Sequence, residues 1–284
     1  MSVTAPLRPQ ADTFRPSTVR SAPVHERDAK LNRMLNKVPA VTLAFWVVKM
    51  MSTTVGETAA DYLQFNVGLG IEITTILMSV LFFTALAWQM TRDRYMPSPY
   101  WLTVVLVSIV GTLVTDYLVD VAGVSLVSAS LGFGLALGLT FAAWFASERT
   151  LSIHSIFTHR REAFYWAAIL FTFALGTAAG DLFAEAMGLG YATSAVIFAA
   201  VIGAVYAAYR FGMNAVLAFW AAYVLTRPFG ASLGDWLSQP VANGGLGLGV
   251  TGTSMLFLVV IAGLVGWMTF KQRTHHDEWS DQAA

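Results

Sequence analysis

The sequence predicts an all-α integral membrane protein, with eight transmembrane helices arranged as four parallel two-helix repeats. Three observations lead to this prediction. Of the 284 residues, 56% are hydrophobic and only 12% are charged, which is about half the charged fraction of an ordinary soluble domain. Apolar segments of about 20 residues, the length that crosses about 30 Å of hydrocarbon, follow one another from Ala40 onward. A short motif recurs four times, in register with alternate segments.

The eight apolar segments are separated by connections that alternate in charge. The predicted helices span residues 40–63, 71–91, 100–119, 124–146, 163–185, 190–210, 213–237 and 246–270. The connections after the second, fourth and sixth helices carry Arg, and both tails carry Lys and Arg, whereas the other turns have neither. Because Lys and Arg are retained on the cytoplasmic side, both termini are predicted to be cytoplasmic.

Composition divides the chain into one membrane domain and two tails. Residues 1–36 are rich in Pro, Arg, Ser and Asp, and we expect a disordered cytoplasmic tail without the apolar core of a signal peptide. The membrane domain is predicted over residues 37–273, and a second cytoplasmic tail over 274–284. Its four repeats are expected at about 38–95, 96–158, 159–212 and 213–272.

Each odd-numbered helix carries a Trp, a Gly ten residues later and an Asp five residues after that. The four copies are Trp46–Gly56–Asp61, Trp101–Gly111–Asp116, Trp166–Gly176–Asp181 and Trp220–Gly230–Asp235. A unit of two crossings enters the membrane from the same side each time, so the repeats are parallel and surround a common axis. We expect the Trp and Gly residues to be structural, with the Gly residues allowing close helix packing.

With these motifs, the sequence resembles a family of bacterial multi-pass membrane proteins built from four tandem copies of a two-helix repeat of unknown function. Each copy in that family has a characteristic Trp. The matching residues are Trp46, Trp101, Trp166 and Trp220. The resemblance covers about residues 38–272 and implies the eight-helix fold and a location in the bacterial inner membrane. It implies no substrate.

Carboxylates cluster near one end of the odd-numbered helices, the end opposite to the repeat Trp. At 1.5 Å per residue, each repeat Asp lies about 22 Å beyond its Trp, in the outer part of the membrane. The acids at this level are Glu57, Asp61, Glu72, Asp116, Asp120, Asp181, Glu185 and Asp235. Charged side chains inside a membrane commonly line a cavity, which makes these acids candidates for ion binding and transport. The alternative is that each Asp caps the turn that follows it.

In the two middle copies a second acid follows the repeat Asp after four residues, giving the pairs Asp116/Asp120 and Asp181/Glu185. The outer copies offer Gln instead, in slightly different register. This pattern favours two pseudo-twofold halves over a fourfold ring. Paired carboxylates can share a proton or coordinate a hard cation.

Two cations lie inside predicted helices, Lys49 in the first and Arg227 in the seventh. Lys49 is close enough to the cytoplasmic side for its long side chain to reach the interface. Arg227 lies deeper, beside Pro228, and a guanidinium keeps its charge, so it requires a carboxylate or water. Glu57 and Asp61 are the expected partners, in an ion pair that is either purely structural or part of gating.

Catalytic and cofactor signatures are absent from the sequence. There is no Cys, and the five His residues lie in the tails or in the connection between the fourth and fifth helices. No haem, zinc, copper or iron–sulfur site is expected in the core, and no cofactor is predicted. The sequence contains no nucleophile elbow and no HExxH motif, so we do not expect an enzyme.

The predicted function is therefore transport of a cation, either proton-coupled or a hard divalent metal such as manganese or magnesium, through the outer cluster of Asp and Glu. The metal itself is left open. The alternative is a non-transporting membrane scaffold or interaction protein. The expected partners are the lipid bilayer and a small cation or proton. No nucleic-acid partner is expected, and a homo-oligomer is left open.

Overall fold

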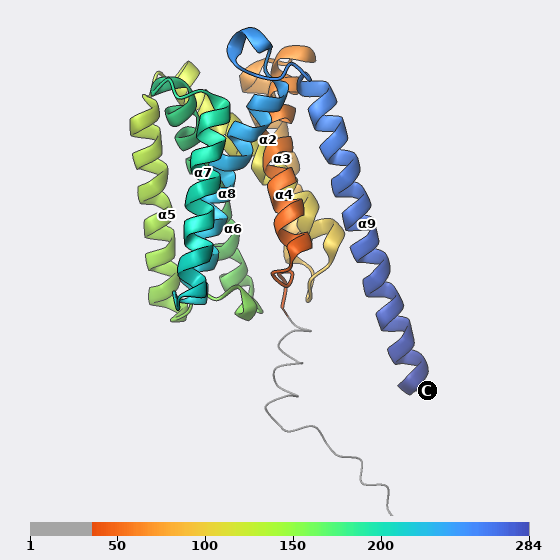
Figure 1. Cartoon of the computed structure of the whole chain (residues 1–284). Coiled ribbons are helices and arrows are strands. Elements are labelled where there is room, and N and C mark those ends of the chain that lie inside the picture. Colours follow the sequence, from red (N-terminus) through yellow and green to blue (C-terminus); the bar gives the residue numbers. More distant parts are fainter. Residues whose placement is uncertain (1–35, 284) are drawn as a thin grey trace, which may run out of the picture.

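A computed structural model describes residues 36–283, which form helices and connecting turns without a strand (Figure 1). The eight long helices are α2 (Leu43–Asp61), α3 (Gly70–Met90), α4 (Pro97–Asp116), α5 (Leu126–Glu148), α6 (His159–Asp181), α7 (Tyr191–Arg210), α8 (Ala215–Ser238) and α9 (Val250–Ala283). Five-residue π-helical turns follow three of them: η1 (Tyr62–Asn66), η2 (Tyr117–Val121) and η4 (Leu182–Ala186). Each long helix corresponds to one predicted apolar segment.

The predicted tails differ from the observed boundaries. Residues 1–35 of the expected disordered tail lie outside the described residues. Asn36, predicted to belong to that tail, is buried, and its Nδ2 donates to the carbonyl of Ile153 at 3.1 Å. At the other terminus α9 continues to Ala283, so residues 274–283 extend the last helix.

Seven of the eight long helices are long and apolar enough to cross a membrane, and α2 is the exception. It carries Lys49, Glu57 and Asp61 together with several Ser and Thr side chains, which lower its hydropathy. Most of these polar side chains are buried, because α2 is packed against α4, α8 and α9. A helix with this composition can lie at membrane depth only where protein surrounds it.

Four inner helices form a closed ring. α2 packs against α4, α4 against α6, α6 against α8, and α8 against α2. The outer helices α3, α5 and α7 pack on α4, α6 and α8, and α9 packs on α2. The second helix of each repeat therefore packs mainly on the first helix of the next repeat. The contact between α9 and α2 closes this arrangement between the two ends of the chain.

Each repeat Gly lies in a close contact between two inner helices. A Cβ atom added at any of these positions would collide with the neighbouring inner helix. The contacts are Gly56 with Ser108, Gly111 with Phe173, Gly176 with Arg227, and Gly230 with Thr53. All four neighbours stand seven residues after the Trp of the adjacent repeat. The same contact is thus repeated four times around the ring, and the pseudo-twofold packing favoured by the acid pairs is wrong.

Near one end of the ring, adjacent inner helices are also joined by aromatic contacts. Each contact involves the aromatic residue that directly precedes a repeat Trp. This residue contacts the Trp of the next repeat, with ring centroids 5.5 to 6.1 Å apart. The pairs are Phe45 with Trp101, Tyr100 with Trp166, Tyr165 with Trp220, and Phe219 with Trp46. These distances are typical of favourable tilted aromatic pairs. We call these eight residues the aromatic layer.

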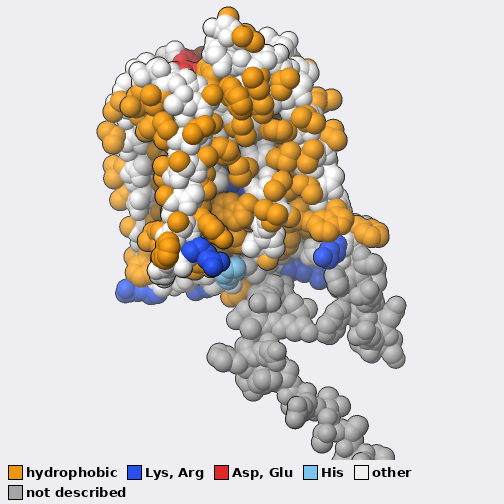
Figure 2. All heavy atoms as spheres, in the orientation of Figure 1, with side chains coloured by type: hydrophobic (Ala, Val, Ile, Leu, Met, Phe, Trp, Pro, Cys, Tyr) orange, Lys and Arg blue, Asp and Glu red, His pale blue; other side chains and the backbone are white. Residues whose placement is uncertain are grey.

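Charges of opposite sign gather at the two ends of the bundle. Figure 2 shows Lys and Arg side chains at the end where both described termini leave the bundle in Figure 1, and acidic side chains at the opposite end. We call these the basic end and the acidic end. At the basic end Lys37 Nζ donates to Glu162 Oε2 at 2.8 Å, and both side chains are buried. This ion pair anchors the start of the bundle to α6.

Substitution of a repeat Gly tests the close approach of the inner helices. At Gly111 a Cβ would lie 2.7 Å from Phe173 Cβ and 3.1 Å from the backbone nitrogen of Ala174, which cannot move unless α4 and α6 separate. We expect Gly111→Ala to lower the free energy of unfolding in detergent micelles by about 1–3 kcal/mol.

The control is Gly138→Ala on the exposed face of α5, where an added Cβ meets no atom within 4 Å. Its effect should stay within about 1 kcal/mol. Equal effects of the two substitutions would contradict the assignment of Gly111 to a tight helix contact.

Candidate functional site

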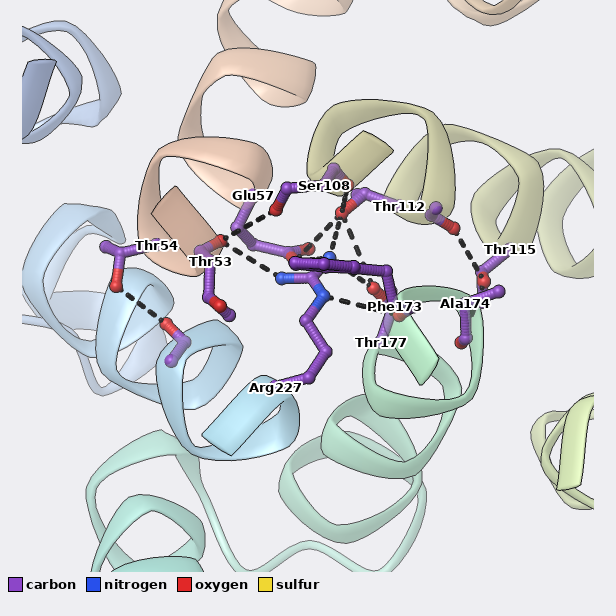
Figure 3. A network of polar contacts seen from close by, with 12 residues as sticks. Thr53, Thr54, Glu57, Ser108, Thr112, Thr115, Phe173, Ala174, Thr177 and Arg227 are labelled. Carbon is purple, nitrogen blue, oxygen red and sulfur yellow. Dashed lines mark hydrogen bonds and ion pairs between the residues drawn. The ribbon is translucent and has the colours of Figure 1, made fainter. Parts of the chain in front are cut away.

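Arg227 occupies the centre of the ring of inner helices (Figure 3). Its side chain is fully buried. The Nη2 atom lies 3.2 Å from Glu57 Oε2 on α2, donates to the Thr112 hydroxyl on α4, and donates to Thr177 Oγ1 on α6 at 2.6 Å. One guanidinium from α8 therefore joins all four inner helices.

The other two nitrogens of the guanidinium donate to backbone carbonyls. Nη1 donates to Thr53 at 3.0 Å and Nε donates to Phe173 at 3.3 Å. Gly176 leaves room for this path, because a Cβ there would collide with the Arg227 side chain. Of the two expected partners, Glu57 forms the ion pair, and in the described part of the chain Asp61 forms none with Arg227.

The three side chains that contact Arg227 Nη2 occupy equivalent positions in their repeats. The residue eleven positions after the Trp is Glu57, Thr112, Thr177 or Ala231. Three of these are polar and face the arginine, while the fourth is a small residue on the helix that carries it. Sequence reasoning missed Thr112 and Thr177, although comparison of this position across the repeats would have found them.

Three carboxylates converge on the acidic side of the guanidinium. One oxygen from each of Glu57, Asp181 and Asp235 lies within 4.8 Å of the other two. Glu57 and Asp235 are buried and Asp181 is half-buried. The most widely separated oxygen ligands of one bound Mg²⁺ or Ca²⁺ ion, those on opposite sides of it, are about 4–5 Å apart. The three oxygens therefore lie close enough together to bind one hard cation. We call these three residues the carboxylate trio.

The repeat Asp residues do not cap the helix ends in the way the alternative prediction requires. Asp61, Asp116 and Asp181 stand where an α-helix passes into a π-helical turn, and none makes a side-chain capping bond. Asp116 Oδ2 accepts from Gln64 Nε2 at 3.5 Å. In the described residues, no hydrogen bond reaches the side-chain oxygens of Asp61, Asp181 or Asp235, so these oxygens are available to a ligand.

In each predicted acid pair, Asp116/Asp120 and Asp181/Glu185, the second acid lies outside the site. Asp120 and Glu185 are exposed and lie within the π-helical turns, and Glu185 Oε1 accepts from Tyr191 at 3.1 Å. Four residues carry a helix about 6 Å further along its axis, which places these acids beyond the packed layer of the inner helices. The acid that lies beside Asp181 and Asp235 is Glu57, one turn deeper than Asp61.

Lys49 lies on the basic side of Arg227. Its Nζ donates to the carbonyl of Tyr223 at 3.0 Å and to Thr226 Oγ1 at 2.5 Å. The side chain is fully buried, so it does not reach the interface at the basic end. Both predicted intramembrane cations therefore lie in the interior of the ring.

All four helix pairs match one sequence family, described as a repeat of unknown function (DUF347). The matched segments are residues 44–95, 99–150, 164–212 and 218–274. The chain belongs to this family. Each matched DUF347 segment contains one inner helix with its Trp, Gly and Asp and the outer helix that follows, which confirms the predicted resemblance. Searches of curated proteins and of solved structures gave no significant match.

The DUF347 repeat accounts for the aromatic layer and the four Gly contacts, which occur in every copy. Lys49, Glu57 and Arg227 occur once each at their repeat positions. The chemistry of the site therefore depends on residues that distinguish the copies.

Removal of the guanidinium tests its pairing with Glu57. Arg227→Gln leaves a carboxylate buried without its cation, and we expect the free energy of unfolding to fall by about 3–5 kcal/mol. The double variant Arg227→Gln/Glu57→Gln should recover part of this loss, because the uncompensated charge is gone. Thermal unfolding in micelles measures both.

The matched control is Arg210→Gln at the exposed end of α7, which should change stability by no more than about 0.5 kcal/mol. If Arg227→Gln is as stable as this control, the ion pair does not hold the ring together.

Proposed function

We propose that the protein transports a hard divalent cation such as Mn²⁺ or Mg²⁺ across the bacterial inner membrane, in exchange with protons. Glu57, Asp181 and Asp235 bind the cation. The observation that supports this function is the convergence of the carboxylate trio at the axis of a helical ring whose outer helices are long and apolar. Oxygen ligands of this kind are preferred by hard cations.

In this proposal all eight long helices cross the membrane and both termini are cytoplasmic. Because Lys and Arg are retained on the cytoplasmic side of membranes, their distribution supports a cytoplasmic location of the basic end. α2 makes the eighth crossing despite its polar composition, because its polar side chains are buried in the ring. The carboxylate trio then lies in the outer half of the membrane.

The charges of the site fit a divalent ion. The trio carries three negative charges when ionised, and Arg227 contributes one positive charge beside Glu57, which leaves two negative charges. Glu57 has two oxygens and can hold the guanidinium and a cation together. Three carboxylates this close repel one another unless a cation or protons balance them. Protons and the metal ion therefore compete for the same oxygens, so the binding of the cation depends on pH.

The arrangement favours a carrier over an open channel. Toward the basic end the axis is filled by Arg227, and beyond it lie Tyr100, Tyr165 and Tyr223, all fully buried. The hydroxyls of Tyr100 and Tyr165 are hydrogen-bonded to each other at 2.5 Å. A cation bound at the trio is thus separated from the basic end until these groups move.

The alternative is a non-transporting scaffold, and one observation favours it. The bonds of Arg227 to all four inner helices are what a structural lock requires. In that case the acids serve only the fold, and no ion crosses.

Uptake of Mn²⁺ into proteoliposomes separates the two functions. We expect Asp181→Asn and Asp235→Asn each to lower the uptake rate by about tenfold or more, since a contact with a charged group contributes about 1.5–3 kcal/mol. Thermal unfolding of each variant checks that the ring is intact.

Asp120→Asn and Glu185→Gln are the controls, because both acids lie at the same end of the bundle but are exposed. They should retain most of the uptake. A wild-type protein that moves neither Mn²⁺ nor Mg²⁺ under any pH gradient would refute transport of these ions and favour the scaffold.

A further inference from the structure

Lys49 is a buried amine without a carboxylate partner in the described part of the chain. Its Nζ has two hydrogen-bond acceptors, the Tyr223 carbonyl and the Thr226 hydroxyl. It also lies 4.5 Å from the centre of the Tyr223 ring and 5.4 Å from that of Phe173. An ammonium ion in such a place is held only by carbonyl, hydroxyl and aromatic groups.

The contrast with Arg227 shows which buried cation can change its charge. A guanidinium keeps its proton, and Arg227 is correspondingly paired with Glu57. A lysine can release its proton when buried. A neutral amine has two N–H groups, and the two acceptors around Nζ satisfy both. The surroundings of Lys49 therefore accommodate the amine as well as the ammonium ion.

Lys49 is electrostatically connected to the carboxylate trio through Arg227. The Arg227 guanidinium lies 5.2 Å from the centre of the Phe173 ring, the same ring that Lys49 approaches. Two positive charges that both contact one aromatic ring repel each other inside a protein. Glu57 reduces that repulsion by neutralising Arg227. A divalent cation that binds Glu57 beside Arg227 adds two positive charges to this group, so the repulsion acting on a charged Lys49 increases.

Other charged groups around Lys49 are few. On α8 the titratable or charged groups that face it are Tyr223 and Arg227, and α6 presents Phe173. Within the described residues, no titratable side chain of α4 or α9 contacts it. The charge on Arg227 is therefore the main electrostatic influence that cation binding can change.

A pocket provides a route for the proton toward the basic end. It has a volume of about 700 Å³, lies between α2, α7 and α8, and reaches from Ser152 and His154 to Thr226. Figure 2 shows the hollow in this face of the bundle, with hydrophobic side chains on its walls. Thr226 thus lines the pocket and also accepts the hydrogen bond from Lys49.

We propose that Lys49 holds the proton that is exchanged for the cation, and releases it through Thr226 to water in this pocket. The inference rests on the proposed transport and names the residue that couples it to protons. The Thr226 hydroxyl donates to the Tyr223 carbonyl at 2.8 Å in this structure, so it must first turn toward the pocket. An Nζ proton then passes to Thr226 Oγ1 while the hydroxyl proton of Thr226 passes to a water molecule. Lys49 becomes a neutral amine, Thr226 is unchanged, and a hydronium ion leaves past His154.

Lysine NMR tests proton exchange directly. The chain has four Lys residues, so labelling the ε carbon with ¹³C gives four signals, and Lys49→Arg identifies that of Lys49 by its loss. We expect this signal to move between its ammonium and amine positions as pH is raised, and toward the amine when Mg²⁺ is added. Lys271, which is exposed, should show no response to Mg²⁺. A Lys49 signal that stays at the ammonium position throughout would overturn the proposal.

Proteoliposomes with a pH-sensitive dye inside test the coupling. We expect Lys49→Met to lower the number of protons moved per Mn²⁺ by at least tenfold, and Lys271→Met to leave it unchanged. Thr226→Val should slow proton movement while the NMR titration of Lys49 persists. The same proton count in Lys49→Met as in the wild type would overturn the inference and leave the proposed transport standing. A wild type that moves no cation would refute the transport, while the pH titration of Lys49 by NMR still decides proton exchange.

Discussion

The contact of each repeat Gly with the neighbouring inner helix is the constraint on which the other features depend. It recurs from Gly56 to Gly230, always against the residue seven positions after the next Trp. Helices this close leave room on the axis for few large side chains. In three quadrants the residue at that position is Thr53, Ser108 or Phe173, and in the fourth it is an arginine that fills the centre. The Gly contacts thus decide that one guanidinium, and not four, can lie there.

Closure of the ring allows the polar helix α2 to lie within an otherwise apolar bundle, because its polar side chains are covered by other helices. α2 has too many charged and hydroxyl side chains to face lipid, and it is covered by α4, α8 and α9. Two of these covering helices belong to the last repeat, so the polar face of α2 is covered only when the whole chain has been assembled. The buried polar groups of α2 are then satisfied by partners distant in sequence, such as Thr54 with the carbonyl of Gly230 and Thr58 with Ser254.

The sequence predicted what a single helix can encode and missed what depends on the rotation of one helix against another. Segment length, the motif spacing and the charge of the connections led to the eight helices and four repeats. The need of Arg227 for a carboxylate led to Glu57. The pairs Asp116/Asp120 and Asp181/Glu185 were visible because they lie along one helix. Convergence of acids from three different helices has no such signature, because it depends on how the Gly contacts orient each helix toward the axis.

The four copies are alike in packing and unlike in charge, and electrostatics gives the reason. Residues spaced by four along each inner helix form a ridge, which on α2 contains Lys49, Thr53, Glu57 and Asp61. A charge repeated at one level of a symmetric ring faces copies of its own sign. Lys49, Arg227 and Glu57 avoid this because each occurs once at its level. Only the Asp level keeps the same charge in all four copies, so it is the level at which the ring itself requires cations or protons.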